Sequence, residues 1–198
     1  MPTQDPEPHH HLLFREASRE QLLRTPLFTV HRATRFPVDK ESERSDFYLL
    51  ENRDWVAVVP VLDLGGPKEA FLMVRQYRHG IEALTLEFPA GLVNEGESPE
   101  AAARRELEEE TGHQASGLAH AATLGAAPAF MTNKCHIYVA WGLARTKDLA
   151  LDPGERLEVA TMPARTLMAQ MGKGELQNSI TAAAHYFYLR WAGIPGSP

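Results

Sequence analysis

The sequence has few of three features: cysteine, long apolar runs and excess positive charge. Its 198 residues include one cysteine, Cys135, so the fold needs neither an internal disulfide nor an oxidising compartment. No apolar run approaches the ~20 residues of a membrane-spanning helix, and residues 1–11 lack the apolar core of a signal peptide. With 26 acidic residues against 20 Lys plus Arg, the net charge of −6 disfavours a nucleic-acid-binding surface. We therefore expect a cytoplasmic protein with neither nucleic-acid nor membrane partners.

What the sequence does contain is enough apolar material for a layered fold. Hydrophobic residues make up 43% of the chain, which is too many for a disordered protein. Residues 1–11 are polar and proline-rich and are expected to form a loose tail. The predicted strands cover residues 27–33, 46–51, 55–62, 71–76, 84–88, 118–125, 136–144 and 156–160, and the predicted helices cover residues 99–111, 163–171 and 179–191. Strands on both sides of an internal helix predict an α/β fold around a mixed sheet.

The clearest predicted helix, residues 99–111, carries most of the negative charge. Ser98 suits its N-cap, Pro99 its first position and Gly112 its end. Residues 95–110 contain seven glutamates and two arginines, a net charge of −5, which leaves only about −1 for the rest of the chain. Most of the net negative charge of the chain is therefore concentrated in this one segment.

The spacing of these glutamates favours a bound cation. Glu106 and Glu110 share one helix face, and Glu109 lies beside them. Burial would raise their pKa values, and an opposite charge would relieve the repulsion. Oxygen ligands without a His or Cys cluster suit Mg²⁺, or Mn²⁺. A solvated surface helix is the alternative that the helix alone leaves open.

The residues upstream of the helix complete a longer pattern, GLVNEGESPEAAARRELEEETGH, which starts at Gly91. It resembles the Nudix box, and the fixed positions that match are Gly91, Glu97, Arg105, Glu106, Leu107, Glu109, Glu110 and Gly112. His113 departs from the box because the family has an aliphatic residue there. The resemblance implies a Nudix-type α/β/α sandwich around a mixed sheet. Its loop–helix–loop would bind divalent cations and hydrolyse a nucleoside diphosphate that is linked to another group.

The resemblance also implies roles for individual residues. The metal ligands would be the backbone carbonyl of Ala90 and the carboxylates of Glu106, Glu109 and Glu110. Glu109 is alternatively a catalytic base. Glu97 and Arg105 would hold the loop against the helix.

Two segments before the box resemble the ADP-ribose pyrophosphatase branch of the family. Gln76-Tyr77-Arg78 is followed by the EFPAG segment at residues 87–91. In that branch the arginine at the position of Arg78 contacts the substrate phosphates, and its fork geometry suits this role. Glu87 would contact the substrate or the metal site.

Features after the box point to the same branch. Pro128, sixteen residues after Gly112, marks the ADP-ribose subgroup, and the neighbouring Phe130 and Met131 would line the nucleoside or ribose pocket or anchor the loop. Residues 152–159 resemble a loop that carries a general base. Glu155 matches that base, with Glu158 as the runner-up.

The resemblance divides the chain at about residue 55. Residues 1–55 would form a tail and a small β subdomain that makes a homodimer, and residues 56–198 the catalytic domain. The expected activity is Mg²⁺-dependent hydrolysis of ADP-ribose to AMP and ribose 5-phosphate. The alternatives are other nucleoside diphosphate sugars such as GDP-mannose, or NADH, and a sensor that binds such a ligand without cutting it.

Overall fold

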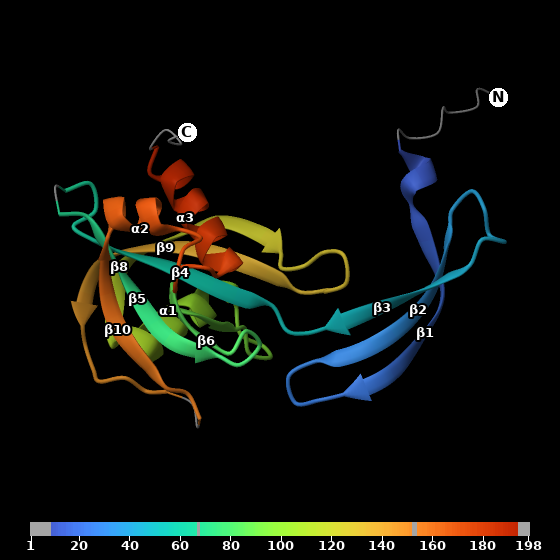
Figure 1. Ribbon diagram of the computed structural model, residues 1–198, viewed down its shortest axis with the longest axis horizontal. Coiled ribbons are helices and arrows are strands. Elements are labelled where there is room, and N and C mark those ends of the chain that lie inside the picture. The colour runs from blue at the N-terminus through green and yellow to red at the C-terminus, as the bar shows by residue number, and fades with distance from the viewer. Residues whose placement is uncertain (1–8, 67, 152–153, 194–198) are drawn as a thin grey trace. The chain divides into compact units, whose positions relative to one another are not determined.

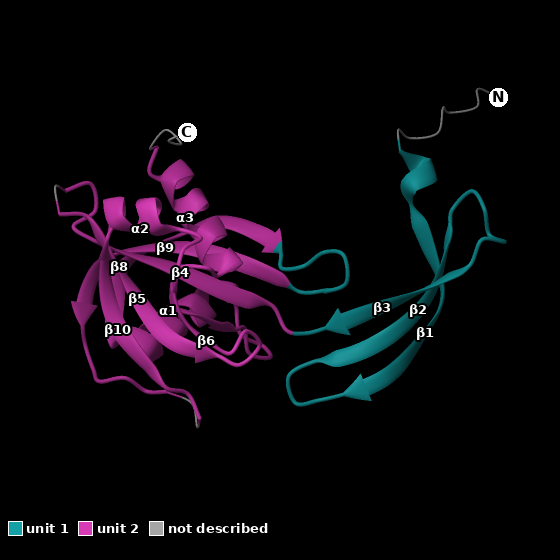
Figure 2. Ribbon diagram, viewed as in Figure 1, with its two compact units in different colours: residues 1–52, 125–133 teal, residues 53–124, 134–198 magenta. Residues whose placement is uncertain are grey.

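The computed structural model describes residues 9–66, 68–151 and 154–193. Two compact units share the chain, one made of residues 1–52 and 125–133, the other of residues 53–124 and 134–198 (Figure 2). The segment 125–133 joins the first unit through Leu50. The backbone N–H of Leu50 donates to the carbonyl of Phe130 at 2.8 Å, and its carbonyl accepts from the N–H of Thr132 at 3.1 Å. The sequence assigns this segment to the catalytic domain, whereas its contacts group it with the N-terminal strands.

The first unit is a three-stranded antiparallel sheet of β1 (Phe14–Arg24), β2 (Thr29–Pro37) and β3 (Ser45–Glu51), in that order. The predicted strands at 27–33 and 46–51 are confirmed as β2 and β3. The sequence did not predict β1. All eleven of its residues are exposed, so no alternation of apolar and polar residues marks it. Of the predicted tail, residues 1–8 lie outside the described part, and His10–Leu12 form the 3₁₀ helix η1.

The second unit contains a seven-stranded mixed sheet with three helices (Figure 1). Its elements are β4 (Trp55–Leu62), β5 (Ala70–Arg78), β6 (Ala83–Glu87), β7 (Ala90–Leu92), α1 (Pro99–Thr111), β8 (His113–Gly125), β9 (Lys134–Arg145), β10 (Leu157–Pro163), α2 (Ala164–Gln170) and α3 (Ser179–Trp191). The main strand order is β10-β5-β4-β9-β8, with β6 beside β5 and β7 beside β4. Strand β4 runs parallel to β9 and antiparallel to β5. None of the described helices is long and apolar enough to cross a bilayer.

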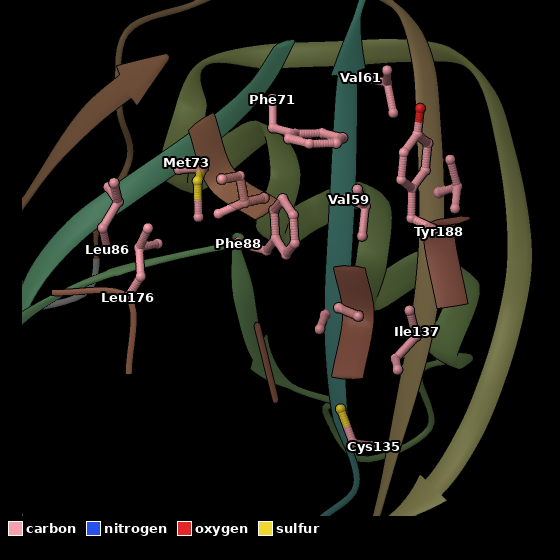
Figure 3. Packing of buried hydrophobic residues seen from close by; sticks show 14 residues of the cluster. Val59, Val61, Phe71, Met73, Leu86, Phe88, Cys135, Ile137, Leu176 and Tyr188 are labelled. Atoms are coloured by element: carbon pink, nitrogen blue, oxygen red, sulfur yellow. The ribbon is translucent and has the colours of Figure 1, made fainter. Parts of the chain in front are cut away.

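The central strand β4 divides the core into two layers because its successive side chains point to opposite faces. Val56 and Val58 pack on one face with residues of α1, namely Ala102, Ala103 and Leu107. On the other face, β4 contributes to the larger cluster shown in Figure 3, whose buried members are Ala57, Val59, Val61, Phe71, Met73, Leu86, Phe88, Cys135, Ile137, Val139, Leu167, Leu176, Ala184 and Tyr188. Helices therefore cover both faces of the sheet, and the predicted α/β/α architecture is confirmed.

Helix α1 has the predicted bounds and the predicted ends. The Ser98 hydroxyl accepts the N–H of Ala101 at 3.2 Å. At the other end Gly112 is left-handed, with φ of 71°, and a Cβ there would lie 2.3 Å from the carbonyl oxygen of Lys147. Only glycine meets both conditions. The helix thus stops at a fixed point, which sets where its glutamates stand on the sheet.

Candidate active site

Arg105 organises the acidic half of α1. Its guanidinium donates to both carboxylate oxygens of Glu97 at 3.0 Å and to the backbone carbonyl of Leu92 at 2.9 Å. It also pairs with Glu106 at 2.7 Å and with Glu109 at 3.0 Å. One arginine therefore ties the loop before α1 to the helix, as the resemblance implied for Glu97 and Arg105. Glu97 in turn accepts the N–H of Asn94 at 3.0 Å, which closes the loop on itself.

Gly91 allows Glu106 to lie directly against strand β7. A Cβ built at residue 91 would be 2.0 Å from one carboxylate oxygen of Glu106. Any larger residue would displace that carboxylate, so the first glycine of the box has a local steric reason. The contact brings the helix face of Glu106 onto the segment that contains Ala90.

Glu110 is the most buried glutamate of α1, with 4% of its surface exposed. One carboxylate oxygen accepts the backbone N–H of Ala90 at 3.0 Å. Burial, followed by the charge of Glu106, raises the pKa of Glu110 to about 8. Burial also raises the pKa of Glu106, although the hydrogen bond from Arg105 opposes the shift. Ionising both carboxylates would therefore put more negative charge here than their surroundings neutralise.

This acidic pair fits a divalent cation by its chemistry. Carboxylate oxygens in mutual repulsion are the donors that Mg²⁺ prefers, and a cation would lower the cost of ionising Glu106 and Glu110. Among the described residues, no group of three His, Cys, Asp or Glu side chains is arranged to hold an ion as it stands. Arg105 donates to one oxygen of Glu106 and to one of Glu109.

Arg78, at the end of β5, forms a two-pronged pair with Glu87. Its Nε and Nη2 donate to the two carboxylate oxygens at 2.9 and 2.7 Å. The Glu87 side chain is 3% exposed, whereas that of Arg78 is 42% exposed. Burial opposes ionisation of Glu87, but the hydrogen bonds from Arg78 and from Thr85 outweigh it, so its pKa lies below the ordinary value. The positive charge of Arg78 also acts on Glu110, which puts the guanidinium near the acidic pair.

The remaining predicted residues fall in three places. The charge of Glu155 helps to raise the pKa of both Glu106 and Glu110, so this loop residue lies near them. Glu158, on β10, pairs instead with Arg75 at 3.4 Å and is largely exposed. The other three residues belong to the first unit: Pro128 and Phe130 are exposed there, and Met131 forms a bridge with Leu50. Of the loop that contains Glu155, residues 152–153 lie outside the described part.

Sequence reasoning missed two residues of this site, Thr85 and Asn178. The Thr85 hydroxyl donates to Glu87 at 2.5 Å, and the Asn178 side chain helps to lower the pKa of the same carboxylate. Asn178 lies 91 positions after Glu87 and belongs to no motif. The one signal for Asn178 in the sequence is its position directly before helix α3, where asparagine is a favourable N-cap residue.

Comparisons with known proteins agree on one family. The NUDIX domain model matches residues 52–182. The chain is 32% identical over 158 residues to the ADP-ribose pyrophosphatase of Bacillus subtilis, covering 79% of this chain and 82% of the relative. It is 30% identical over 177 residues to the ADP compounds hydrolase NudE of Escherichia coli, covering 87% and 89%. It is also 32% identical over 143 residues to the ADP-sugar pyrophosphatase of Mus musculus, covering 69% of this chain and 65% of the relative.

A solved structure supports the same grouping. The crystal structure of an ADP compounds hydrolase superposes with a TM-score of 0.79 at 28% identity, covering 92% of this chain and 96% of that chain. The likeness extends over nearly the whole length, so the fold is shared beyond the box.

Proposed function

The chain belongs to the Nudix hydrolases, and from that premise we propose that it hydrolyses the pyrophosphate bond of ADP-ribose, giving AMP and ribose 5-phosphate. The observation that carries the proposal is that the charge of Arg78 acts on Glu110, whose carboxylate is in turn influenced by that of Glu106. A diphosphate needs a cation to approach such carboxylates, and an arginine fork to hold its oxygens. The relatives named for ADP-ribose, ADP-sugars and ADP compounds support an adenosine diphosphate substrate.

The carboxylates of Glu106 and Glu110 would hold a divalent cation, Mg²⁺ or Mn²⁺, with Glu109 and the carbonyl of Ala90 as further ligands. When bound, such an ion would neutralise charge on the pyrophosphate and lower the pKa of a bound water. Oxygen donors support this choice of metal. Arg105 and Glu97 keep the helix face in register with the loop.

Substrate would be held by Arg78 at the phosphates. Its Nε and Nη2 are committed to Glu87, so its remaining N–H groups are those that can donate to phosphate oxygens. Because Glu87 is buried and engaged by Arg78, we assign it the role of anchor rather than of direct substrate contact. Pro128, Phe130 and Met131 remain proposed nucleoside or ribose contacts on the resemblance alone.

We propose Glu155 as the general base, with Glu109 and then Glu158 as alternatives. The base accepts a proton from water at a carboxylate oxygen. The water oxygen then bonds to one phosphorus, the bond between that phosphorus and the bridging oxygen breaks, and the bridging oxygen leaves as part of the other phosphate, which gives AMP and ribose 5-phosphate. The influence of Glu155 on the pKa values of Glu106 and Glu110 supports its nearness to the reaction. The matched test is Glu155→Gln against Glu158→Gln: turnover should fall at least about a hundredfold in the first and stay near wild type in the second. The reverse order would remove Glu155 from the mechanism.

A substrate panel tests the proposed reaction. Purified protein with Mg²⁺ is given equal concentrations of ADP-ribose, an ADP-hexose, GDP-mannose and NADH, and products are separated by chromatography. We expect the highest kcat/KM with ADP-ribose and equal amounts of AMP and ribose 5-phosphate. Faster turnover of another compound would refute the substrate. Thermal stabilisation by ADP-ribose without products would favour the sensor alternative.

We also propose a homodimer through the N-terminal subdomain and a cytoplasmic location. Within the described residues, strand β1 pairs only with β2 and is exposed along its whole length, and such edge strands invite pairing with another chain. Exposed apolar side chains on the same unit, including Leu22, Leu23 and Tyr48, support an interface there. The buried, unpaired Cys135 agrees with a reducing compartment. Light scattering of the purified protein tests the dimer, and a monomeric mass would exclude it.

A further inference from the structure

We propose that Thr85 and Asn178 are positioning residues, which fix the phosphate-binding guanidinium of Arg78 through the buried carboxylate of Glu87. The inference deepens the proposed function and rests on it, since Arg78 matters to a substrate only if the protein binds a phosphate compound. Neither residue belongs to the Nudix box or to the two segments that precede it.

The Glu87 carboxylate is the centre of a small closed network. It accepts Nε and Nη2 of Arg78 at 2.9 and 2.7 Å and the hydroxyl of Thr85 at 2.5 Å. The side chain of Asn178 also stabilises its charged form and so helps to lower its pKa. A buried carboxylate has about four lone-pair positions, and the hydrogen bonds from Arg78 and Thr85 fill three of them. The Glu87 carboxylate is therefore held in one orientation. Because Arg78 donates two hydrogen bonds to it, the guanidinium of Arg78 is held in one orientation as well.

A fixed orientation matters because of the exposure of Arg78. Its side chain is 42% exposed, and an unanchored arginine there would sample many rotamers. A substrate that immobilised it would have to offset the loss of this rotamer freedom. Because Nε and Nη2 are already bonded to Glu87, this side-chain entropy is lost when the protein folds and not when the substrate binds. The outward N–H groups then point in one direction before the substrate arrives.

Asn178 has a second role at the start of helix α3. An ionised carboxylate only accepts hydrogen bonds, so Asn178 can act on Glu87 through its amide N–H groups while its side-chain oxygen serves another partner. Its Oδ1 accepts the backbone N–H groups of Ile180 at 2.8 Å and Thr181 at 3.0 Å and so caps helix α3. The amide nitrogen remains as the donor for the carboxylate. The loop before it is held to strand β6 by the N–H of Leu86, which donates to the carbonyl of Glu175 at 2.9 Å. The N-terminus of α3 is thus connected to the phosphate arginine.

The purely structural alternative is that Asn178 serves only as a helix cap. Substitutions separate the two roles because Asn, Asp and Ser cap helices about equally well. Asn178→Ser keeps the cap but is too short to reach Glu87. Asn178→Asp keeps the cap and puts a second negative charge beside the carboxylate. Asn178→Ala removes both functions. At the other contact, Thr85→Val removes the hydroxyl at nearly constant shape, and Thr85→Ser retains it.

The experiment measures KM, kcat and melting temperature for these five variants with ADP-ribose. We expect KM to rise about three- to tenfold in Thr85→Val and Asn178→Ser and more in Asn178→Asp, with kcat within about twofold of wild type. Thr85→Ser should match wild type in KM. Asn178→Ala should raise KM as Asn178→Ser does, and alone should show the loss of the cap as a lower melting temperature. A KM that changes only in Asn178→Ala would overturn the proposal.

A second measurement needs no substrate and so separates this proposal from the proposed function. In protein labelled with ¹⁵N-arginine, the Nε–H signal of Arg78, identified by its absence in Arg78→Lys, should exchange slowly with water. Thr85→Val and Asn178→Ser should accelerate that exchange severalfold, and Thr85→Ser should not. Equal exchange rates in all variants would overturn the positioning role even if ADP-ribose is hydrolysed. If no compound of the panel is hydrolysed, the proposed function fails. The exchange rates would still show whether Thr85 and Asn178 hold the guanidinium of Arg78 in place.

Discussion

Glu110 and Glu87 are about equally buried, at 4% and 2% exposure, yet their pKa values move in opposite directions. Burial raises the pKa of Glu110 to about 8, and the charge of Glu106 adds to the shift. Burial acts on Glu87 as well, but Arg78 and Thr85 donate enough hydrogen bonds to lower its pKa. The α1 region therefore has acid in excess, and the β5–β6 region has acid that is fully paired.

The difference assigns the two regions different tasks. Excess negative charge on α1 is costly until a cation arrives, so that region is suited to binding metal. The paired carboxylate of Glu87 requires nothing further and is suited to holding Arg78 still. We therefore assign the chemical step to the unpaired acid of α1 and the positioning of substrate to the paired carboxylate of Glu87. Substitutions in the first region should mainly change kcat, and substitutions in the second should mainly change KM.

The largest expected effect comes from neutralising the excess acid. Glu106→Gln and Glu110→Gln should each lower kcat about a thousandfold or more, because each removes a proposed metal ligand. Folding stability should not fall in Glu110→Gln, because a neutral amide of the same shape removes repulsion between the pair and can still accept the N–H of Ala90. Turnover with Mg²⁺ and melting temperature without it are the measurements. Turnover near wild type in both variants would remove the proposed role of this pair.

A smaller effect should follow from moving one carboxylate without neutralising it. Gly91→Ala places a methyl group where the Glu106 carboxylate lies, and we expect a loss of about 10–100-fold in kcat with little change in stability. Gly80→Ala is the matched control, because a Cβ at residue 80 meets nothing within 4 Å. Raising the Mg²⁺ concentration should restore part of the Gly91→Ala activity. Equal activities of the two alanine variants would show that the close contact is not needed.

The paired region should respond in KM rather than in kcat. Arg78→Lys keeps the charge but cannot fork Glu87 while also reaching a phosphate, so KM should rise about tenfold with a smaller fall in kcat. Steady-state kinetics over a range of ADP-ribose concentrations measures both. A change confined to kcat would place Arg78 with the α1 region and would erase the contrast between the two.

The contrast also explains what the sequence could predict. The hydrogen-bond partners of Arg105 described above lie within 13 residues of it, and such short spacings leave a readable motif. The bounds of α1 follow equally from local signals, Ser98 and Gly112. The network around Glu87 instead joins residues 85 and 178, and only the folded sheet brings them together. No spacing in the sequence marks that pair.

Two further elements were not predictable for related reasons. Strand β1 is exposed along its whole length, so burial left no alternating pattern in it. Strand β7 has only three residues, Ala90–Leu92, and follows Pro89, which looks like a break in the strand pattern. Its pairing with β4 from Trp55 to Ala57 depends on tertiary contacts. Both cases show that short or edge strands take their definition from their neighbours.

The smallest effect, and the most direct measure of the difference between Glu110 and Glu87, is the pH dependence of stability without metal. The pKa of Glu110 rises from an ordinary 4.5 to about 8, so the folded state holds a proton that the unfolded state releases. Stability should therefore be greatest below about pH 4.5 for this group and fall as the pH rises toward 8. Melting curves should show this slope flattened in Glu110→Gln and unchanged in Glu43→Gln, an exposed control. Because Mg²⁺ competes with the same proton, its stabilising effect should grow over this pH range. A Mg²⁺ effect independent of pH would mean that the ion binds elsewhere.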